Sequence, residues 1–335
     1  MNVVFVNPDH PEQPLTLTEQ PDPRPGPTQI VVDVKAAGVN RADLLQRRGL
    51  YPPPPDESDI LGLEIAGDVL AVGEKVHDFR IGERVFGLVA GGGYAEQCLL
   101  DHRLAHRIPD DRSYVWAAAL CEIGYTANEN LFHHGRLQTG ESVLIHAGAS
   151  GVGSAAVRMA ALRDCRVLTT TSTETKQAFC RTLGAETVIP YKTRSFVEVV
   201  RAAGGVDVIL DFVGAAYLSD NLKSLKQGGR LVVVGLLGGR KGELDLSLVL
   251  RKNLSITGSV LRARTLAEKI AVKGRFCAGW QEAIDNDDFR PHVFQTFPLS
   301  QAEAAHACMR DNQHHGKIVL TRDESPPSPQ APDRN

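Results

Sequence analysis

Three glycines and a serine near the middle of the chain have a spacing that could hold a phosphate. Gly148, Gly151 and Gly153 follow an apolar run typical of a buried strand, and Ser150 stands where the G-x-G-x-x-G pattern has its second glycine. Glycines let the backbone turn sharply and leave space beside it. Small and apolar residues at helical spacing over 152–162 place the first amides of a helix next to this turn, where a pyrophosphate binds favourably. The stretch predicts a dinucleotide site, and the alternative is a glycine-rich turn that binds nothing.

The next predicted strand ends in hydroxyl residues and not in an acid. An NAD site usually has Asp or Glu about 20 residues after the glycines, where the carboxylate binds the ribose 2′-hydroxyl. Thr171 stands at about that distance, the first acid is Glu174, and Lys176 follows it. Hydroxyls and a cation suit a 2′-phosphate, which a carboxylate would repel. These residues predict NADPH in preference to NADH, with a solvated lysine at a helix start as the alternative for Lys176.

Alternating elements after residue 118 are predicted to position these residues. Helix patterns lie between apolar strand patterns, which occur at 143–147, 166–171, 187–190, 207–212, 230–235 and 254–260. The alternation predicts a parallel sheet with helices on both faces, which binds its ligand at the carboxyl ends of the strands. One helix is predicted over 116–134, and capping boxes at 265–268 and 300–303 predict the starts of two later helices.

The first part of the chain has a different pattern. Short strand patterns separated by proline-rich and glycine-rich turns predict a small, mostly β or barrel-like unit. Strand-like segments at 291–297 and 317–321 are expected to return to it. The predicted domains are therefore a discontinuous substrate domain of residues 1–118 and 288–325, a cofactor domain of residues 119–287, and a disordered tail of residues 326–335, which is rich in proline and serine.

The composition is that of an ordinary globular protein of about two domains. The 335 residues are 42% hydrophobic and 23% charged, and the net charge of −3 does not favour nucleic acid or an anionic membrane as partner. The six cysteines form no C-x-x-C pair, which favours reduced thiols. No signal peptide pattern is present, and no apolar run reaches the ~18 residues of a membrane span. We therefore expect a cytoplasmic protein.

Metal ligands are missing from the segments around two candidate positions. A catalytic zinc ion needs about three ligands from Cys, His or acidic side chains. Glu64 has no histidine beside it, and the segment 38–43 contains no cysteine. The sequence therefore predicts no metal site.

Five motifs, taken together and in order, point to a known superfamily. They are Gly-Val-Asn-Arg-Ala-Asp-Leu at 38–44, Leu-Gly-Leu-Glu at 61–64, the glycine stretch 143–153, Ser-Val-Leu-Arg-Ala-Arg at 259–264 and Gly-Lys-Ile-Val-Leu at 316–320. From residue 2 to residue 321 the chain resembles the zinc-independent, NADPH-dependent quinone oxidoreductases of the medium-chain dehydrogenase/reductase superfamily. The resemblance implies an α/β fold with a Rossmann-type doubly wound parallel sheet plus a GroES-like mostly β domain. Zinc-dependent relatives have histidine at Leu63 and cysteine near Asn40, in agreement with the prediction of no metal.

The resemblance also implies residue roles. Asn40, Tyr51 and Thr126 are expected to face the nicotinamide and the substrate carbonyl. The pyrophosphate is expected to contact Ser150, Gly151 and Val152. The 2′-phosphate is expected to contact Thr171 and Lys176, and the adenosine half is expected to contact Tyr191. The nicotinamide ribose is expected to contact Val213, Leu236 and Leu237, and further cofactor contacts are expected from Leu261, Arg262 and Asn312. For Arg262 and Arg264, an exposed pair beside an edge strand is the alternative. Residues 254–260 resemble the edge strand through which family dimers pair, which implies a homodimer.

The expected reaction is hydride transfer from NADPH to a small-molecule quinone or a related conjugated carbonyl. Negative charge then grows on the acceptor oxygen, and the Asn40 amide and the Tyr51 hydroxyl are the donors expected to stabilise it. No strong internal acid is evident, so water is expected to protonate the product, with Tyr51 as the alternative acid. An enal or enoyl-thioester reductase and an NADPH-binding redox sensor without significant catalysis are the alternative functions.

Overall fold

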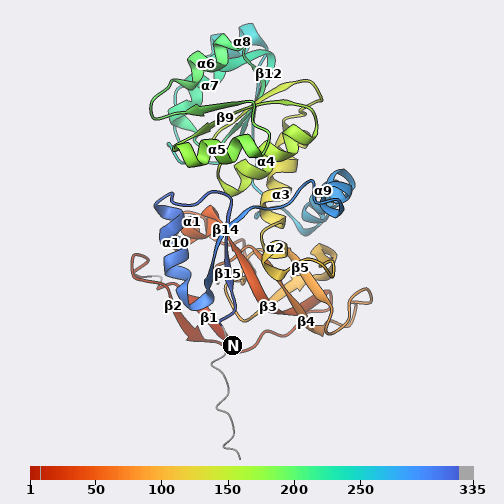
Figure 1. Cartoon of the computed structure of the whole chain (residues 1–335). Coiled ribbons are helices and arrows are strands. Elements are labelled where there is room, and N and C mark those ends of the chain that lie inside the picture. Colours follow the sequence, from red (N-terminus) through yellow and green to blue (C-terminus); the bar gives the residue numbers. More distant parts are fainter. Residues whose placement is uncertain (8, 324–335) are drawn as a thin grey trace, which may run out of the picture.

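Two sheets of different kinds make up the structure, a computed structural model that describes residues 1–7 and 9–323. In Figure 1 the lower sheet contains strands from both ends of the chain, and the upper sheet contains strands from its middle. Helix α3 (Cys121–Asn128) lies between the two. The predicted tail 326–335 falls outside the described residues.

The lower sheet has seven strands in the order β14-β15-β3-β4-β5-β7, with β6 paired to β3 beside this path. Its strands are β3 (Gln29–Val39), β4 (Glu64–Val72), β5 (Arg84–Leu88), β6 (Gln97–Asp101), β7 (Ala105–Arg107), β14 (Val293–Pro298) and β15 (Lys317–Thr321). A separate two-stranded sheet consists of β1 (Asn2–Phe5) and β2 (Thr16–Glu19). The long strand β3 is mostly buried and pairs with β15, β4 and β6, so it holds this sheet together.

Strands β14 and β15 bring the last part of the described chain back to the first part. β15 pairs antiparallel with β3, with Ile318 opposite Val39, and β14 pairs parallel with β15. The return of these two segments to the lower sheet agrees with the expected path of the chain. The domain boundaries proposed near residues 118, 288 and 325 stay predictions.

The upper sheet has six parallel strands in the order β10-β9-β8-β11-β12-β13. They are β8 (Ser142–Ile145), β9 (Arg166–Thr171), β10 (Thr187–Pro190), β11 (Val206–Asp211), β12 (Leu225–Val233) and β13 (Ser255–Gly258). Counted along the chain, this is the order 3-2-1-4-5-6 of a Rossmann-type sheet. The predicted doubly wound parallel sheet is therefore confirmed.

Helices cover both faces of the upper sheet because successive strand residues point to opposite sides. Val143 and Ile145 belong to one apolar cluster, whereas Leu144 between them belongs to another. In Figure 1, α4 (Gly151–Leu162) and α5 (Glu174–Thr182) lie on one face, and α6 (Phe196–Ala202), α7 (Leu218–Ser224) and α8 (Leu246–Lys252) lie on the other. The sheet is thus buried on both sides, as its continuous apolar strands indicated.

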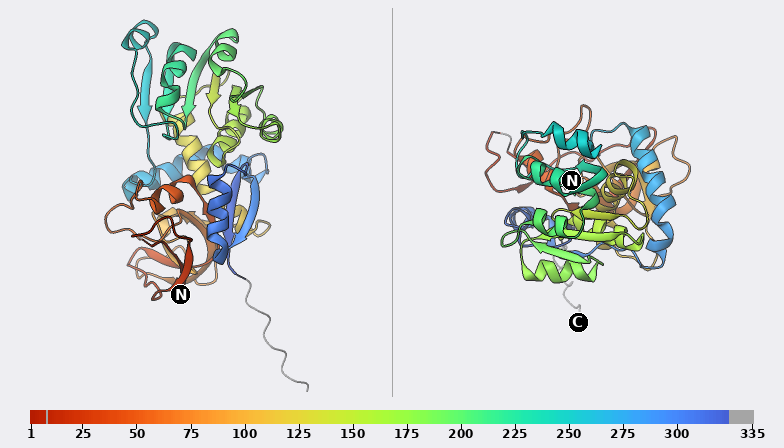
Figure 2. Two further views of the ribbon diagram at one scale, coloured as in Figure 1. Left: turned by 90° about the vertical axis from the view of Figure 1, so that its left-hand side faces the viewer. Right: turned by 90° about the horizontal axis from the view of Figure 1, so that it is seen from above.

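One apolar cluster runs from the lower sheet through α3 to the upper sheet. It contains Phe86 of β5, Tyr125 of α3 and Val208 of β11, and Phe276 of helix α9 (Leu266–Asp285) also belongs to it. The side view in Figure 2 shows the two parts stacked end to end. A site formed by residues of both parts would therefore rest on packed apolar side chains.

The helix predicted over 116–134 is three pieces. They are α2 (Tyr114–Ala118), α3, and a π-helical segment, η2 (Glu129–His134). The Asn130 side-chain amide donates to the Thr126 carbonyl at 2.8 Å, and the Gly135 amide donates to the Asn130 carbonyl five positions earlier. The Asn130 side chain thus bonds to a carbonyl that a main-chain amide of the helix would otherwise use, and the last turn of the helix is wider.

Of the two predicted capping boxes, only the first forms. Thr265 caps α9 together with Glu268. Helix α10 (Ala302–Arg310) instead begins after a 3-10 turn, η4 (Leu299–Gln301). Ser300 donates its hydroxyl to Asp323, and Glu303 accepts from Arg47 at 2.7 Å, so the box predicted at 300–303 is wrong because both side chains have tertiary partners. Among the described residues, no helix combines the length and the hydropathy needed to cross a membrane.

Candidate functional site

The turn after β8 is built against the neighbouring strand β9. The buried ring of His146 is hydrogen-bonded to Thr170 Oγ1 at 3.2 Å and to Asn221 Oδ1 at 2.8 Å. Ala147 then adopts a left-handed conformation with φ of +50°, and its amide also donates to Thr170 Oγ1. These contacts turn the chain away from the sheet, so β8 ends earlier than the predicted strand 143–147.

The glycines of this turn are required by space. A Cβ at Gly148 would lie 1.9 Å from Thr169 Oγ1, and a Cβ at Gly153 would lie 2.2 Å from the carbonyl oxygen of Ala147. At Gly151 the nearest atom would be Lys317 Cδ, at 3.0 Å. Gly148 and Gly153 therefore allow the turn to close, whereas Gly151 lies where the turn meets the lower sheet.

Helix α4 begins at this turn with a side-chain cap. Ser150 is the N-cap, and its hydroxyl oxygen accepts from the Gly153 amide at 3.1 Å. The amides of Gly151 and Val152 occupy the first two helical positions, where an α-helix offers no carbonyl acceptor. They lie at the positive end of the helix dipole and can bind a pyrophosphate. The structure thus places the residues predicted for the pyrophosphate in one turn.

The end of β9 carries a buried hydroxyl, Thr171 Oγ1, that has no hydrogen-bond partner among the described residues. Lys176 in the first turn of α5 donates from Nζ to Asn312 twice, to the carbonyl oxygen at 2.8 Å and to Oδ1 at 2.6 Å. Tyr191, which is 40% exposed, donates its amide to the Thr171 carbonyl. The three residues predicted for the adenosine half lie at this corner together with Asn312, which was predicted as a further cofactor contact. The alternative of a solvated lysine is wrong, because Lys176 is only 6% exposed.

This corner has more positive charge than the sequence indicated. Burial lowers the pKa of Lys176, and the nearby charges of Lys192 and Arg41 lower that pKa further. Among the described ion pairs, none joins these three cations to a carboxylate. An anion bound between them would relieve their mutual repulsion. Arg41 and Lys192 were not predicted as site residues, since each stands alone in its segment of sequence.

The carboxyl ends of β11 and β12 lie at the same edge of the upper sheet as the end of β9, on the other side of β8. The Asp211 carboxylate accepts from the amide of Val213 at 2.7 Å and fixes the turn after β11. Leu236 and Leu237 follow β12 and are 50% and 60% exposed. Exposed apolar side chains at this edge can contact a ligand in the crevice, which is where the nicotinamide ribose was expected.

Asn40 lies in a buried polar cluster assembled from distant parts of the chain. Its Nδ2 donates to Glu64 Oε1 at 3.0 Å and to the Gly38 carbonyl at 3.3 Å, and its Oδ1 accepts from Lys317 Nζ at 2.7 Å. Lys317 Nζ also donates to Glu64 Oε1 at 2.6 Å. Both N–H groups of the Asn40 amide are therefore engaged. The predicted donation from Asn40 to an acceptor oxygen does not fit this geometry.

The same cluster continues into α1 (Arg41–Arg47). The main-chain amide of Asn40 donates to Asp43 Oδ2 at 2.7 Å, and the Tyr94 hydroxyl donates to the same oxygen at 3.0 Å. Burial raises the pKa of Asp43 to about 6, against the opposing effect of these donors. Asn40 is thus fixed at both its main chain and its side chain.

Tyr51 lies against Arg262. Nη1 of Arg262 donates to the Tyr51 carbonyl at 3.2 Å, and the guanidinium lies 5.6 Å from the centre of the Tyr51 ring. Arg262 is 4% exposed, whereas Arg264 pairs with the buried carboxylate of Glu129 at 2.7 Å. The alternative of an exposed pair is therefore wrong. Leu261, half-buried before them, packs on the cluster that joins the two sheets.

Thr126 and Glu122 lie one turn apart on α3, so they share a face of the helix. Thr126 Oγ1 is buried without a hydrogen-bond partner among the described residues. The Glu122 amide donates to Glu64 Oε2 at 2.9 Å, which ties the start of α3 to the cluster around Asn40. The sequence analysis missed Glu122, and the available signal was an isolated acid in an otherwise apolar helix start.

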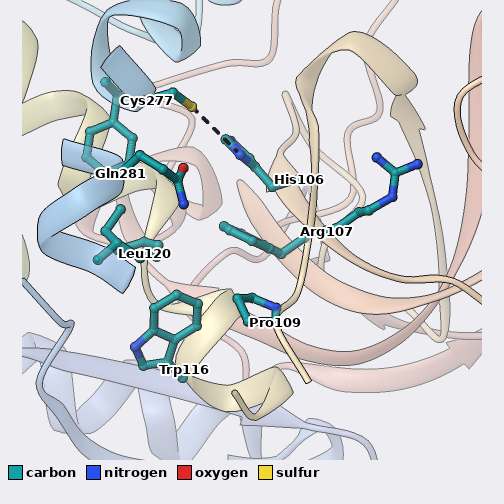
Figure 3. A pocket seen from close by; sticks show the side chains of 10 residues that line it. His106, Arg107, Pro109, Trp116, Leu120, Cys277 and Gln281 are labelled. Atoms are coloured by element: carbon teal, nitrogen blue, oxygen red, sulfur yellow. Dashed lines mark hydrogen bonds between the residues drawn. The ribbon is translucent and has the colours of Figure 1, made fainter. Parts of the chain in front are cut away.

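A cavity of about 160 Å³ lies between α9, α2 and β7, and Figure 3 shows its lining. Cys277 Sγ lies 4.0 Å from His106 Nδ1 across it. Burial lowers the pKa of His106 to about 3 and raises the pKa of Cys277, so the pair is uncharged at neutral pH. None of the residues predicted for cofactor or substrate lines this cavity. The glycine turn and the Asn40 cluster therefore define the candidate site.

Two segments of the chain match domains of known proteins. Residues 26–110 match the alcohol dehydrogenase GroES-like domain, and residues 151–273 match the zinc-binding dehydrogenase family. The chain is 32% identical over 315 residues to quinone oxidoreductase-like protein 2 of Mus musculus, covering 92% of this chain and 89% of that protein. The chain belongs to the medium-chain dehydrogenase/reductase superfamily. As a member of it, the protein is an oxidoreductase that uses a nicotinamide dinucleotide, as predicted.

Two solved members of the superfamily have the same fold. The Escherichia coli quinone oxidoreductase complexed with NADPH superposes with a TM-score of 0.85 at 28% identity, covering 96% of this chain and 99% of that one. The CurK enoyl reductase superposes with a TM-score of 0.81 at 27% identity, covering 92% and 95%. These likenesses confirm the α/β fold with a GroES-like domain beside the Rossmann-type sheet.

The residues present fit the cofactor that the superfamily implies. The glycines leave no Cβ over the start of α4, and the unpartnered Thr171 hydroxyl and the cations beside it suit a phosphate. Over residues 1–7 and 9–323, no three His, Cys, Asp or Glu side chains gather as a metal-binding group. The zinc-independent character of this member stays a prediction, carried by Leu63 and Asn40 at the ligand positions.

Proposed function

We propose that this protein is an NADPH-dependent quinone oxidoreductase that reduces quinones or related conjugated carbonyls without a metal. The bound cofactor supplies the hydride from C4 of its nicotinamide. The quinone oxidoreductase relatives and the NADPH complex of the E. coli protein support this proposal. The observation that carries it is the corner at the end of β9, with its unpartnered hydroxyl and its unpaired cations.

This corner favours NADPH over NADH for an electrostatic reason. A carboxylate at the end of the second strand would bind the ribose 2′-hydroxyl and repel a 2′-phosphate. Here Thr171 offers a hydroxyl, and Lys176 keeps one N–H beyond the two that it donates to Asn312. Arg41 and Lys192 add positive charge beside it. A 2′-phosphate would satisfy all four groups.

The remaining cofactor contacts follow from the sheet edge. The Gly151 and Val152 amides would bind the pyrophosphate, and Tyr191 would cover the adenosine half. Gly148 and Gly153 shape the turn, and Ser150 caps the helix that follows. Further contacts, on the nicotinamide side, would come from Val213, Leu236, Leu237 and Leu261.

Two hydroxyls are left to stabilise negative charge on the acceptor oxygen. The Tyr51 hydroxyl and the Thr126 hydroxyl donate to no acceptor among the described residues. Preformed donors of this kind lower the barrier because they need no reorganisation during the reaction. Asn40 would act indirectly, by holding Glu64 and Lys317 in place beneath them.

The test is a panel of acceptors with purified protein. Loss of NADPH absorbance is followed with quinones, enals and diamide, and the panel is repeated with NADH. Quinone turnover that is faster with NADPH is expected, and a flat panel would end the reductase proposal. Tyr51→Phe is expected to lower kcat/KM by about tenfold or more through the loss of one charge-stabilising donor. An unchanged value would remove the role of Tyr51.

An enal or enoyl-thioester reductase is the second candidate. The likeness to the CurK enoyl reductase favours it, because hydride delivery to an activated alkene uses the same cofactor geometry. The same panel separates the two functions. Turnover of enals or enoyl thioesters above that of quinones would select the second candidate.

We also propose a homodimer formed through β13, the edge strand of the upper sheet. Ile256 on this strand and Val260 after it are 40% and 56% exposed, and Leu246 and Leu250 of α8 are 68% and 83% exposed. Unpaired edge strands with exposed apolar residues favour pairing with a second copy. Sedimentation of the native protein and of Ile256→Asp tests this, with a monomer expected for the variant. The six free thiols are compatible with a reducing compartment such as the cytoplasm.

A further inference from the structure

Glu122 lies where the cofactor turn, the buried polar cluster and the Tyr51 loop meet. The next residue on α3, Ile123, comes within 3.3 Å of the position that a Cβ at Gly151 would take. The Glu122 amide is bonded to Glu64, and Thr126 follows one turn later on the same face. The first turn of α3 therefore lies beside the start of α4, and Glu122 shares a helix face with Thr126.

The Glu122 carboxyl has no hydrogen-bond partner among the described residues, although it is surrounded by protein. The residue is only partly exposed. Burial, followed by the negative charge of Glu64, raises its pKa to about 8. Lys317 and Arg262 oppose the rise but do not cancel it. At neutral pH the carboxyl is thus predominantly protonated, and its O–H donates to no group in the part of the chain that the structure describes.

We propose that Glu122 is the acid that protonates the reduced acceptor. This inference rests on the proposed reductase function and replaces the expectation that water donates the proton. A carboxylic acid at this position lies one helical turn from Thr126 and close enough to Tyr51 for its charge to raise the pKa of that hydroxyl. It was overlooked because the sequence gives no sign of the burial that keeps it neutral.

Hydride delivers two electrons and one hydrogen to the acceptor, which leaves one negative charge on its oxygen. The O–H bond of the Glu122 acid breaks, a new O–H bond forms on that oxygen, and the electron pair of the broken bond stays on the Glu122 carboxylate. Water returns a proton to the carboxylate before the next turnover.

Charged groups from several elements face Glu122 and set its protonation together. Glu64 of β4 and Asp43 of α1 raise its pKa, and Lys317 of β15 and Arg262 lower it. The charge of Glu122 in turn raises the pKa of Tyr51 and of Lys269 on α9. An acid in this setting loses its proton as pH rises through about 8, so the rate of an acid-dependent reaction falls there.

The experiment compares Glu122→Gln with the wild type and with Glu198→Gln, a control at an exposed first-turn glutamate of α6. For the wild type and the control, kcat/KM is expected to fall as pH rises through about 8. For Glu122→Gln, kcat/KM at pH 6.5 is expected to be lower by about 100-fold and independent of pH through this range. Glu122→Asp keeps the acid, so it should recover part of the rate and keep a pH-dependent profile.

A second readout needs neither cofactor nor acceptor. Infrared titration of the protein alone is expected to show a protonated carboxyl that titrates near pH 8 in the wild type and in Glu198→Gln. The band should be missing in Glu122→Gln. A wild-type rate and profile in Glu122→Gln, or a band that persists in it, would overturn the assignment. A wild type that is inactive with every acceptor would instead overturn the proposed function, so the two failures are distinguishable.

Discussion

The glycine turn and the cluster around Lys317 touch each other, but they differ in how their polar groups are satisfied. At the end of β9, beside the turn, Thr171 Oγ1 is buried without a partner in the described chain. Lys317 Nζ, by contrast, has three acceptors within 3.0 Å, namely Glu64, Asn40 and the Val39 carbonyl. We infer that a ligand completes the first region, whereas the second is complete within the protein.

This difference separates affinity from stability. A change in the cofactor turn should alter binding more than folding, because the groups there act on a ligand. A change in the Lys317 cluster should alter folding, because a buried charge without its partner is costly. Four variants test this separation, beginning with the one expected to change stability or affinity most.

Lys317→Met should give the largest loss of stability. Glu64 is 1% exposed and would lose the ammonium group that lies 2.6 Å away. Removing one partner of a buried pair lowers the free energy of unfolding by about 3–5 kcal/mol. Urea denaturation followed by circular dichroism measures this loss.

The matched control is Lys223→Met. Lys223 pairs with Asp220 on the surface of α7, and both side chains are more than 40% exposed. Its loss should cost less than about 1 kcal/mol. Combining Lys317→Met with Glu64→Gln should recover part of the stability, since no unpaired charge then remains. Equal losses for the two lysine variants would mean that the cluster is not the stabilising unit described here.

Gly148→Ala should weaken cofactor binding more than the addition of a methyl group at any other glycine of the turn. The new Cβ would lie 1.9 Å from Thr169 Oγ1, which is itself held by the Ile145 carbonyl at 2.7 Å, so the turn must move. We expect the Kd for NADPH to rise about 10-fold to 100-fold, or about 1.4–2.7 kcal/mol. Fluorescence titration of NADPH measures the change.

Gly274→Ala is the control for this prediction, since nothing lies within 4 Å of its Cβ in α9. It should leave NADPH binding unchanged and stabilise the helix by up to about 1 kcal/mol. Adding Thr169→Ala to Gly148→Ala removes the nearest obstructing atom and should restore part of the affinity. A Gly148→Ala protein with wild-type affinity would show that the turn tolerates a shift without loss of the site.

The same contrast explains how much the sequence revealed. The fold and the cofactor turn could be predicted because their signals are local: alternating strands and helices, glycines at fixed spacing, and Thr171 in place of an acid. The π-helical end of the helix predicted over 116–134 could not be predicted, because it involves the bond from the Asn130 side chain to the Thr126 carbonyl. The predicted capping box at 300–303 failed because Glu303 is bonded to Arg47, 256 positions away.

The polar cluster is the part that sequence alone could not supply. Glu64 and Lys317 are separated by 253 positions and come together only when β15 pairs with β3. Asn40 was therefore given a role as a donor to substrate, although its amide is occupied by this cluster. Glu122 was missed for a related reason, since its chemistry depends on burial and on charged groups that distant parts of the chain bring to it.

Glu122→Gln should make stability less dependent on pH. The folded-state pKa of about 8 lies above the ordinary value of 4.5, so the stabilising contribution is present below pH 4.5 and is lost as pH rises through 8. The variant lacks this loss. Between pH 5 and pH 9, the free energy of unfolding of the variant should rise by about 2 kcal/mol relative to that of the wild type. This value is smaller than the full pKa shift would give, because the side chain is partly open to solvent.

Urea denaturation at several pH values, without cofactor, measures this gain. Glu198→Gln provides the comparison and should follow the wild type throughout. A stability difference between Glu122→Gln and the wild type that stays constant from pH 5 to pH 9 would mean that the Glu122 carboxyl is ionised in the folded protein at all these values.

Lys176→Met should have the smallest effect, because Arg41 and Lys192 remain beside the expected 2′-phosphate. The Kd for NADPH should rise about tenfold, or about 1.4 kcal/mol, while the Kd for NADH stays the same. The exposed variant Lys223→Met should change neither value. An equal loss for both cofactors would indicate that Lys176 acts through its two bonds to Asn312, which tie α5 to the end of α10, and not through the phosphate. Lys176 would then belong with Lys317, as a residue satisfied within the protein, and the cofactor preference would rest on Arg41, Lys192 and the absence of an acid at Thr171.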